Sequence, residues 1–148
     1  MEAERQALIA ADTDLAALYE CLVSVPGVGP VLATELLLTS GEFRTRAEAK
    51  CYASYAGVVP FERSSGQHRG RGRVSHHANK RVKALLHLAA LSAVRWCAPL
   101  KAYYARKVAE GKPKMLVLNN VRNKLVHLLF ACALRRQKYD ENYAPSLA

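Results

Sequence analysis

Apolar residues recur along most of this chain at the alternating three- and four-residue steps that one face of an α-helix requires. The first stripe spans residues 2–23 and is narrow enough to form a coiled-coil seam. Its members are Leu8, Ala11, Leu15, Leu18 and Leu22. Further stripes predict helices over residues 30–40, 45–56, 78–97, 99–110 and 113–137. Because no segment alternates as a strand would, the pattern predicts an all-α fold.

Glycine and proline mark the boundaries between these helices. Pro30 suits the first position of a helix, Thr45 is predicted to cap the next one, and Gly111 is predicted to end a later one. This division predicts three regions. They are residues 1–23, the end of a coiled-coil linker helix; residues 24–138, a helical domain; and residues 139–148, a flexible tail.

The turn between the first two helices reads P-G-V-G-P and matches a helix-hairpin-helix pattern. Glycine permits a positive φ and a close approach of the backbone to a ligand. The helix that begins at Pro30 presents unpaired N–H groups and the positive end of its dipole. Gly27, Val28 and Gly29 are therefore candidate contacts for a nucleic-acid phosphate. The alternative is a tight turn between helices that binds no ligand.

Residues 57–77 form a long irregular stretch, GVVPFERSSGQHRGRGRVSHH, with four glycines, three serines and four arginines. Long loops inside compact domains are usually functional or disordered. Ser65 precedes a glycine, and a serine hydroxyl becomes a nucleophile when a base, cation or metal activates it. Arg69, Arg71 and Arg73 can fork onto phosphate oxygens, which positions and stabilises a phosphoryl group during transfer. Attack on a DNA phosphodiester and simple hydrogen bonding to nucleic acid both remain open for this loop.

The chain has a net charge of +10, and this charge is unevenly distributed. Residues 63–139 hold 18 of the 22 basic side chains and one acid, Glu110, whereas residues 1–62 hold nine of the 12 acids. A segment with one carboxylate cannot neutralise itself through internal ion pairs. A polyanion is therefore the expected partner, and Lys80 and Arg81 are candidate contacts to DNA or RNA. A basic surface that only aids solubility is the alternative.

Other chemistry is sparse in this sequence. His68 and His76 are candidates to move protons near Ser65. No Cys or His spacing suits a metal, and the carboxylates are too scattered for two-metal chemistry, so no metal site or cofactor is expected in this chain. No apolar run approaches the roughly 20 residues of a membrane span. The cysteines, expected to be reduced core thiols of a cytoplasmic protein, are Cys21, Cys51, Cys97 and Cys132.

An ordered series of segments resembles a known family. It runs from SVPGVGPVLATELL through GEFRTR and YAGVVP, followed five residues later by SG, to RGRVS and NKRVKALLHLAA. The series covers about residues 20–136. It resembles the C-terminal transposase domain of the bridge-RNA-guided insertion-sequence transposases, the DEDD type, which combine a RuvC-like domain with a serine.

This resemblance implies how the chemistry is divided. An N-terminal RuvC-like domain carries four acidic residues that bind Mg²⁺, and a coiled-coil segment, corresponding to residues 2–23, leads into the C-terminal domain. The serine that attacks DNA and forms a covalent intermediate corresponds to Ser65, with Ser64 as the neighbouring alternative. Acidic residues and serine meet across protomers, so a homo-oligomer through residues 2–23 is expected. A structured guide RNA pairs with target and donor DNA.

Two departures from the family pattern affect the expected activity. The family often has Lys-x-Gly-Asn before the long helix, where this chain has His76, His77, Ala78 and Asn79. The acidic domain is also missing, so we expect this chain to bind nucleic acid but not to recombine DNA unaided. The predicted function is DNA binding and strand exchange during transposition, in the bacterial cytoplasm near the nucleoid, with Mg²⁺ required by the full-length enzyme. A non-catalytic helix-hairpin-helix module and a structural protein that dimerises through residues 2–23 are the alternatives.

Overall fold

The computed structural model describes residues 1–44, 48–59, 64–65, 68–69 and 78–142, with residues 64–65 and 68–69 described by their backbone. Within these residues the fold is all-α, as the apolar stripes predict. The helices are α1 (Glu2–Ala11), α2 (Thr13–Val23), α3 (Pro30–Thr39), α4 (Ala49–Ala56), α5 (Lys80–Trp96), α6 (Ala98–Ala109) and α7 (Lys114–Arg135). The two strands, β1 (Ser64–Ser65) and β2 (His68–Arg69), form a short antiparallel ladder that the sequence did not predict.

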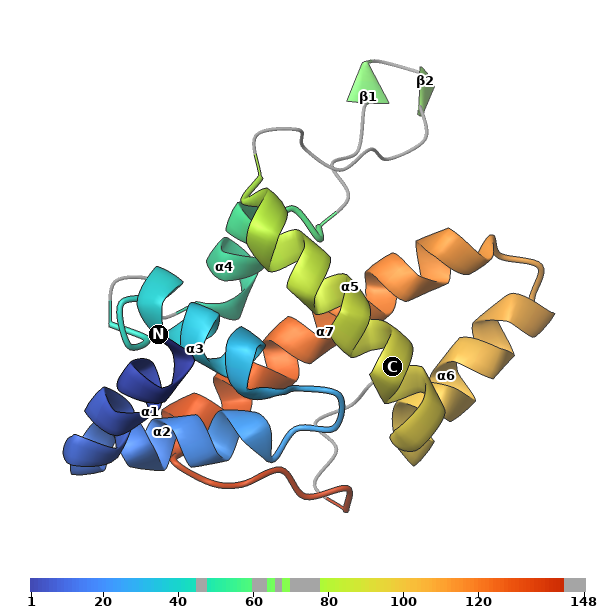
Figure 1. Cartoon of the computed structure of the whole chain (residues 1–148). Coiled ribbons are helices and arrows are strands. Elements are labelled where there is room, and N and C mark those ends of the chain that lie inside the picture. The colour runs from blue at the N-terminus through green and yellow to red at the C-terminus, as the bar shows by residue number, and fades with distance from the viewer. Residues whose placement is uncertain (45–47, 60–63, 66–67, 70–77, 143–148) are drawn as a thin grey trace.

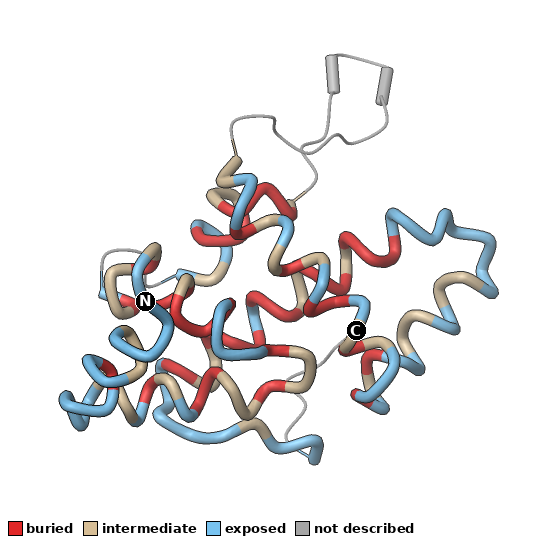
Figure 2. Tube along the Cα trace, in the orientation of Figure 1, coloured by how far each residue is buried: buried red, intermediate tan, exposed pale blue. Residues whose placement is uncertain are grey.

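Helix α7 is the centre of the molecule (Figure 1). Helices α2, α4, α5 and α6 all pack on it, while α3 packs on α2 and α5. Most residues of α7 between Val117 and Ala133 are buried (Figure 2). Phe130 of α7 contacts Phe43 edge-on, with ring centroids 4.8 Å apart, and also contacts Tyr52 of α4. One helix therefore organises the core, and the other helices present their outer faces to solvent.

The prediction of one continuous helix over residues 2–23 is wrong, because the helix is interrupted at Asp12, between α1 and α2. Asp12 has an extended backbone, and its carboxylate accepts hydrogen bonds from the N–H groups of Asp14 and Leu15. An aspartate that caps a new helix competes with continuation of the old one. Helices α1 and α2 then pack against each other (Figure 1). Leu18 and Leu22 lie in the core of this chain, so neither is available for a seam with another chain.

The remaining helices agree more closely with the predicted ones. The exception is α4, whose N-cap is Glu48, whereas Thr45 was predicted as its cap; Thr45 itself lies outside the described residues. The prediction for Gly111 agrees with its positive φ of 87° directly after the C-cap of α6. Helix α5 begins at Lys80, two residues later than predicted, because Asn79 caps it.

Beyond α7, the first residue of the predicted flexible tail is held in place. The Tyr139 N–H donates to Ser24 Oγ at 2.8 Å, and the Tyr139 hydroxyl lies 3.4 Å from Cys97 Sγ. Tyr139 also packs against the core cluster. Residues 143–148 lie outside the described part of the chain. Of the four predicted core thiols, Cys21 and Cys97 are buried, and Cys132 is half-buried and packs against the core. The prediction of a core position is wrong for Cys51, which is exposed.

Candidate nucleic-acid interface

The segment that carries the candidate serine leaves the helical scaffold just after α4. Gly57 ends α4 in the left-handed conformation, with a φ of 70°, which favours glycine. The Val58 N–H then donates to the carbonyl of Ala53 at 3.0 Å. From α7, the side-chain amide of Asn119 donates to the carbonyl of Val58 at 2.9 Å. Since Val58 and Asn119 are both buried, the start of this segment is fixed to the core.

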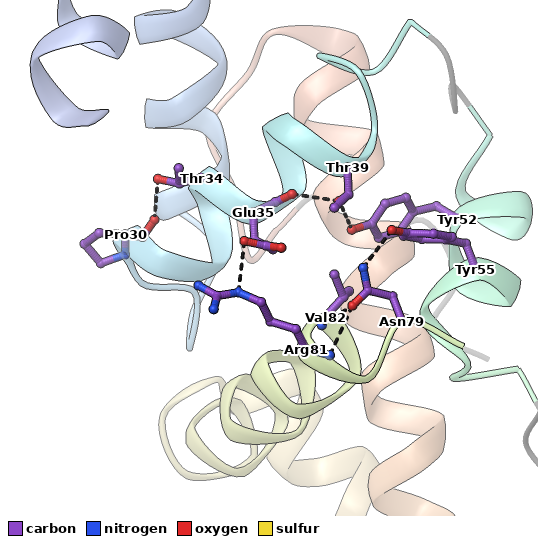
Figure 3. A network of polar contacts seen from close by, with 9 residues as sticks. All are labelled: Pro30, Thr34, Glu35, Thr39, Tyr52, Tyr55, Asn79, Arg81 and Val82. Carbon is purple, nitrogen blue, oxygen red and sulfur yellow. Dashed lines mark hydrogen bonds and ion pairs between the residues drawn. The ribbon is translucent and has the colours of Figure 1, made fainter. Parts of the chain in front are cut away.

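The same segment rejoins the scaffold at Asn79, next to its starting point. The Asn79 N–H donates to the Tyr55 carbonyl at 3.1 Å, and its side-chain amide donates to the Tyr55 hydroxyl at 2.7 Å (Figure 3). The Asn79 side-chain oxygen also accepts from the N–H groups of Arg81 and Val82, each at 3.1 Å. One asparagine therefore caps α5 and ties it to α4. We refer to the Val58–Asn119 and Asn79–Tyr55 contacts together as the loop clamp.

Between the two ends of the loop clamp, the structure describes the backbone of the candidate nucleophile. Ser65 pairs with His68, and Ser64 pairs with Arg69, in the antiparallel ladder of β1 and β2. Ser65, His68 and Arg69, singled out from the sequence for different reasons, are therefore brought together at the backbone level. Of the other predicted loop residues, Arg71, Arg73 and His76 lie outside the described residues.

Lys80 and Arg81, the candidate contacts to nucleic acid, both lie exposed in the first turn of α5. Arg81 is not a free cation, because its Nε lies 3.2 Å from a carboxylate oxygen of Glu35 on α3 (Figure 3). This pair is partly solvated, with 60% of the Arg81 side chain exposed, so it contributes little to stability. Its effect is to join α3 to α5 beside the loop clamp. On the same helix α3, Thr39 contacts the Tyr52 hydroxyl at 2.7 Å.

The three hairpin residues differ in their surroundings. Gly27 has the predicted positive φ, 87°, but it faces α5: a Cβ there would overlap the Ala89 carbonyl. The Val28 side chain is buried, and its N–H donates to the carbonyl of Val25 at 3.1 Å. Gly29 is exposed at the N-terminus of α3, which has no side-chain cap. The open end of α3 is thus the part of this turn that can meet an anion.

Three residues with notable contacts or burial, Asn79, Asn119 and Arg122, were not predicted as site residues from the sequence. Asn79 carried a signal, since asparagine before a helical stripe is a common N-cap. Asn119 and Arg122 carried no such signal, because polar residues that stand between the apolar positions of a helix are expected on its exposed face. Both are buried, with 5% and 7% of their surfaces exposed. Burial lowers the pKa of Arg122 from its ordinary value.

The electrostatics follow the uneven distribution of charge along the sequence. Three ion pairs between described residues join distant helices or segments, and each takes its acid from the first half of the chain and its base from the second. They are Arg81–Glu35, Arg136–Asp14 and Lys138–Glu20. Cations also crowd together on α6 and α7, where burial and then the charges of Arg106 and Lys107 lower the pKa of Lys124.

Two further observations concern metals and membranes. Among the residues that the structure describes, no three His, Cys, Asp or Glu side chains gather in a way that could hold a metal ion. None of the helices in the described part of the chain is both long and apolar enough to span a bilayer.

Comparison with known proteins identifies the family. The model of the transposase IS116/IS110/IS902 family matches residues 19–105. The 43.6 kDa protein of insertion element IS110 from Streptomyces coelicolor is 32% identical over 151 residues, which cover 99% of this chain and 35% of that protein. The 44.8 kDa protein of insertion element IS116 from Streptomyces clavuligerus is 31% identical over 112 residues, covering 76% of this chain and 28% of that protein.

A third relative, the 42 kDa protein of insertion element IS900 from Mycobacterium paratuberculosis, is 34% identical over 94 residues, covering 63% of this chain and 24% of that protein. The chain spans about a third of the length of the curated relatives that it matches. The match of the family model extends from α2 into α6, and it includes Val58, Tyr55 and Asn79 of the loop clamp but not Asn119. This chain therefore belongs to the transposase IS116/IS110/IS902 family.

Proposed function

We propose that this chain is the DNA-binding and strand-exchange domain of an insertion-sequence transposase, and that Ser65 is its nucleophile. The observation that carries the proposal is the loop clamp, which fixes one end of the serine- and arginine-containing loop to the buried Asn119 of α7 and the other end to the half-buried Tyr55 of α4. A nucleophile on a loop needs such anchoring, because misplacement by an ångström is enough to slow a reaction severely. Membership of a transposase family supports the choice of DNA as the substrate.

The proposed reaction exchanges one phosphoester for another. The Ser65 Oγ attacks a phosphorus of the DNA backbone and loses its proton to a base, for which His68 is the candidate. A phosphoserine ester forms, the P–O bond to one side of the broken strand cleaves, and the leaving oxygen takes up a proton. The arginines at 69, 71 and 73 would stabilise the negative charge on the phosphoryl oxygens. Because one ester replaces another, the reverse attack by a second strand completes the exchange.

The proposal assigns Mg²⁺ to the full-length enzyme. Among the described carboxylates, Glu35 is paired with Arg81, and none joins a ligand cluster. The proposal places the four acidic residues expected for the full-length enzyme in a RuvC-like domain outside this chain. A structured guide RNA and a homo-oligomer remain part of the proposal. With Leu18 and Leu22 buried in this chain, the oligomer must use other residues, such as the exposed Leu8.

The test is covalent trapping on a nicked suicide DNA substrate, with the full-length transposase. The wild type is expected to give a protein–DNA adduct that survives denaturing electrophoresis, and Ser65→Ala is expected to abolish it. Ser64→Ala is the matched control, because it removes a hydroxyl from the paired strand position next to Ser65. Loss of the adduct in Ser64→Ala with retention in Ser65→Ala would transfer the role to Ser64.

A non-catalytic DNA-binding module is the second candidate. It is supported by the exposed, uncapped start of α3 at Gly29, where backbone N–H groups can meet a phosphate without reading sequence. This candidate predicts that wild type, Ser65→Ala and Ser64→Ala bind DNA equally and that none forms an adduct. The trapping experiment thus separates chemistry from binding alone.

A further inference from the structure

A shallow groove lies between the N-terminal halves of α5 and α7, two helices that cross in Figure 1. Helix α5 contributes the basic side chains, and α7 contributes one arginine and one methionine. The lining residues are Lys80, Lys83, Ala84, His87, Met115 and Arg122. Within the described part of the chain no carboxylate lines this groove, which we call the α5–α7 groove.

Arg122 is the most unusual residue of the α5–α7 groove. It is 7% exposed, and its Nε is buried with no hydrogen-bond partner. No described carboxylate lies within 4 Å of its guanidinium. Leaving a charged group buried without a partner is strongly unfavourable, and arginine stays protonated in proteins. A buried arginine that lines a groove and has no partner among the described residues indicates a site for an external anion.

The rest of the groove has the same polarity. Lys80 and Lys83 form no ion pair with any described residue. His87 has a buried Nδ1 without a hydrogen-bond partner, and this atom can donate in the appropriate tautomer or when the ring is protonated. Lys80 and Lys83 therefore line the groove with Arg122 without compensation from the described residues, and His87 adds a polar atom without a partner. An anion in the groove would relieve their mutual repulsion as well as the desolvation of Arg122.

The structure assigns a phosphate-binding site to the α5–α7 groove, in which Arg122, flanked by Lys80 and Lys83, takes a phosphodiester of the DNA backbone. This assignment rests on the proposed function. DNA is favoured because the groove starts at Lys80, directly after Asn79, where the serine-containing loop rejoins the scaffold. The groove follows residues 80–87 over about 10 Å of helix, and its cations would hold the strand without reading bases.

The test uses the 148-residue chain, a short DNA duplex and the substitution Arg122→Met. Methionine fills a similar volume without a charge, and replacing an unpaired buried ion with an apolar residue is neutral or stabilising. We therefore expect the Tm to stay or rise while the Kd for DNA increases about tenfold or more, since a charge-assisted contact is lost. The slope of log K against log salt should fall by about 0.9 for one phosphate contact.

The matched control is Arg95→Met, which removes the same charge from the exposed last turn of α5, outside the groove. It should change the Kd less than about threefold. Lys83→Met on the opposite wall of the groove should weaken binding in the same direction as Arg122→Met. If Arg122→Met fails to fold, Lys83→Met decides the question, and an unchanged Kd in that variant overturns the assignment.

Four other outcomes would also overturn the assignment. If the wild type does not bind DNA, the groove assignment and the proposed function fail together. If it binds but Arg122→Met retains its Kd and salt slope, the groove assignment alone fails. If Arg122→Met loses binding to an RNA duplex but still binds DNA as the wild type does, the groove is a site for RNA. Stabilisation by inorganic phosphate over chloride at equal ionic strength, with unchanged DNA affinity in Arg122→Met, would identify a site for free anions.

Discussion

The absence of a side chain at Gly27 lets the turn after α2 pack closely on α5. The turn after α2 passes over α5 so closely that a Cβ at Gly27 would overlap the Ala89 carbonyl oxygen and lie 3.1 Å from the Ala93 nitrogen. Its φ of 87° is also a conformation that other residues rarely adopt. The sequence predicted the positive φ, whereas the contact with α5 depends on the tertiary fold. Gly29 has neither constraint, since no heavy atom lies within 4 Å of its Cβ position.

These two glycines make a matched pair for mutation. Gly27→Ala should lower the free energy of unfolding by roughly 3 kcal/mol, from left-handed backbone strain and overpacking together. Gly29→Ala should lower it by less than about 1 kcal/mol, the difference in N-cap preference. Urea denaturation of both variants measures the two values. Equal losses would mean that the turn does not pack on α5 as described.

Asn79 joins the start of α5 to the end of α4. Its oxygen caps α5, and its amide nitrogen holds the Tyr55 hydroxyl. The two roles use different atoms, so they can be separated by substitution. A serine retains a capping oxygen but is too short to reach Tyr55. The backbone bond from Asn79 to the Tyr55 carbonyl does not depend on the side chain.

Substitution at Asn79 should therefore give a graded result. Asn79→Ser should cost about 1 kcal/mol in the free energy of unfolding, the contribution of one hydrogen bond. Asn79→Ala should cost roughly 2–3 kcal/mol, because the cap is lost as well. Chemical denaturation measures both, and Tyr55→Phe serves as the reciprocal control. If serine were as damaging as alanine, the cap would not contribute to stability.

The elements also show what a sequence can and cannot predict. Helices α3, α5, α6 and α7 were located within two residues, because strong apolar stripes end at proline, glycine or asparagine. The prediction for 2–23 failed because the stripe continues through Asp12 while the cap interrupts the backbone. Ser65, Lys80 and Arg81 were visible as candidates from residue type and position. Arg122 was not, because burial within α7 depends on which helices pack around it.

Burial of ionisable groups links the stability of the folded protein to pH. Burial, and then the hydrogen bond with Cys97, raises the pKa of Tyr139 well above its ordinary value. Burial likewise raises the pKa of the Cys21 and Cys132 thiols. In each case the folded state favours the neutral form. This contribution is fully present below the pKa values of the unfolded chain, about 8.5 for cysteine and 10 for tyrosine, and is lost as the pH rises.

We therefore expect the free energy of unfolding to decrease as the pH rises above about 9. Tyr139→Phe should remove part of the decrease above about pH 10, because it removes one of the groups that must ionise. Urea denaturation between neutral and alkaline pH measures the effect. Tyr104→Phe, which removes a phenol from α6, is the matched control. A decrease of the same size in Tyr139→Phe and wild type would contradict this origin.

The three ion pairs between the acidic and basic halves have a further consequence for how this protein meets a polyanion. They engage cations at the far end of α7 and at Arg81, whereas the groups of the α5–α7 groove keep their charges uncompensated within the described residues. The molecule is thus an electric dipole as well as a net cation. The electric field of a DNA duplex should orient the protein during approach, with the α1–α2 side pointing away from the DNA. Most collisions should then begin with the α5–α7 groove facing the strand.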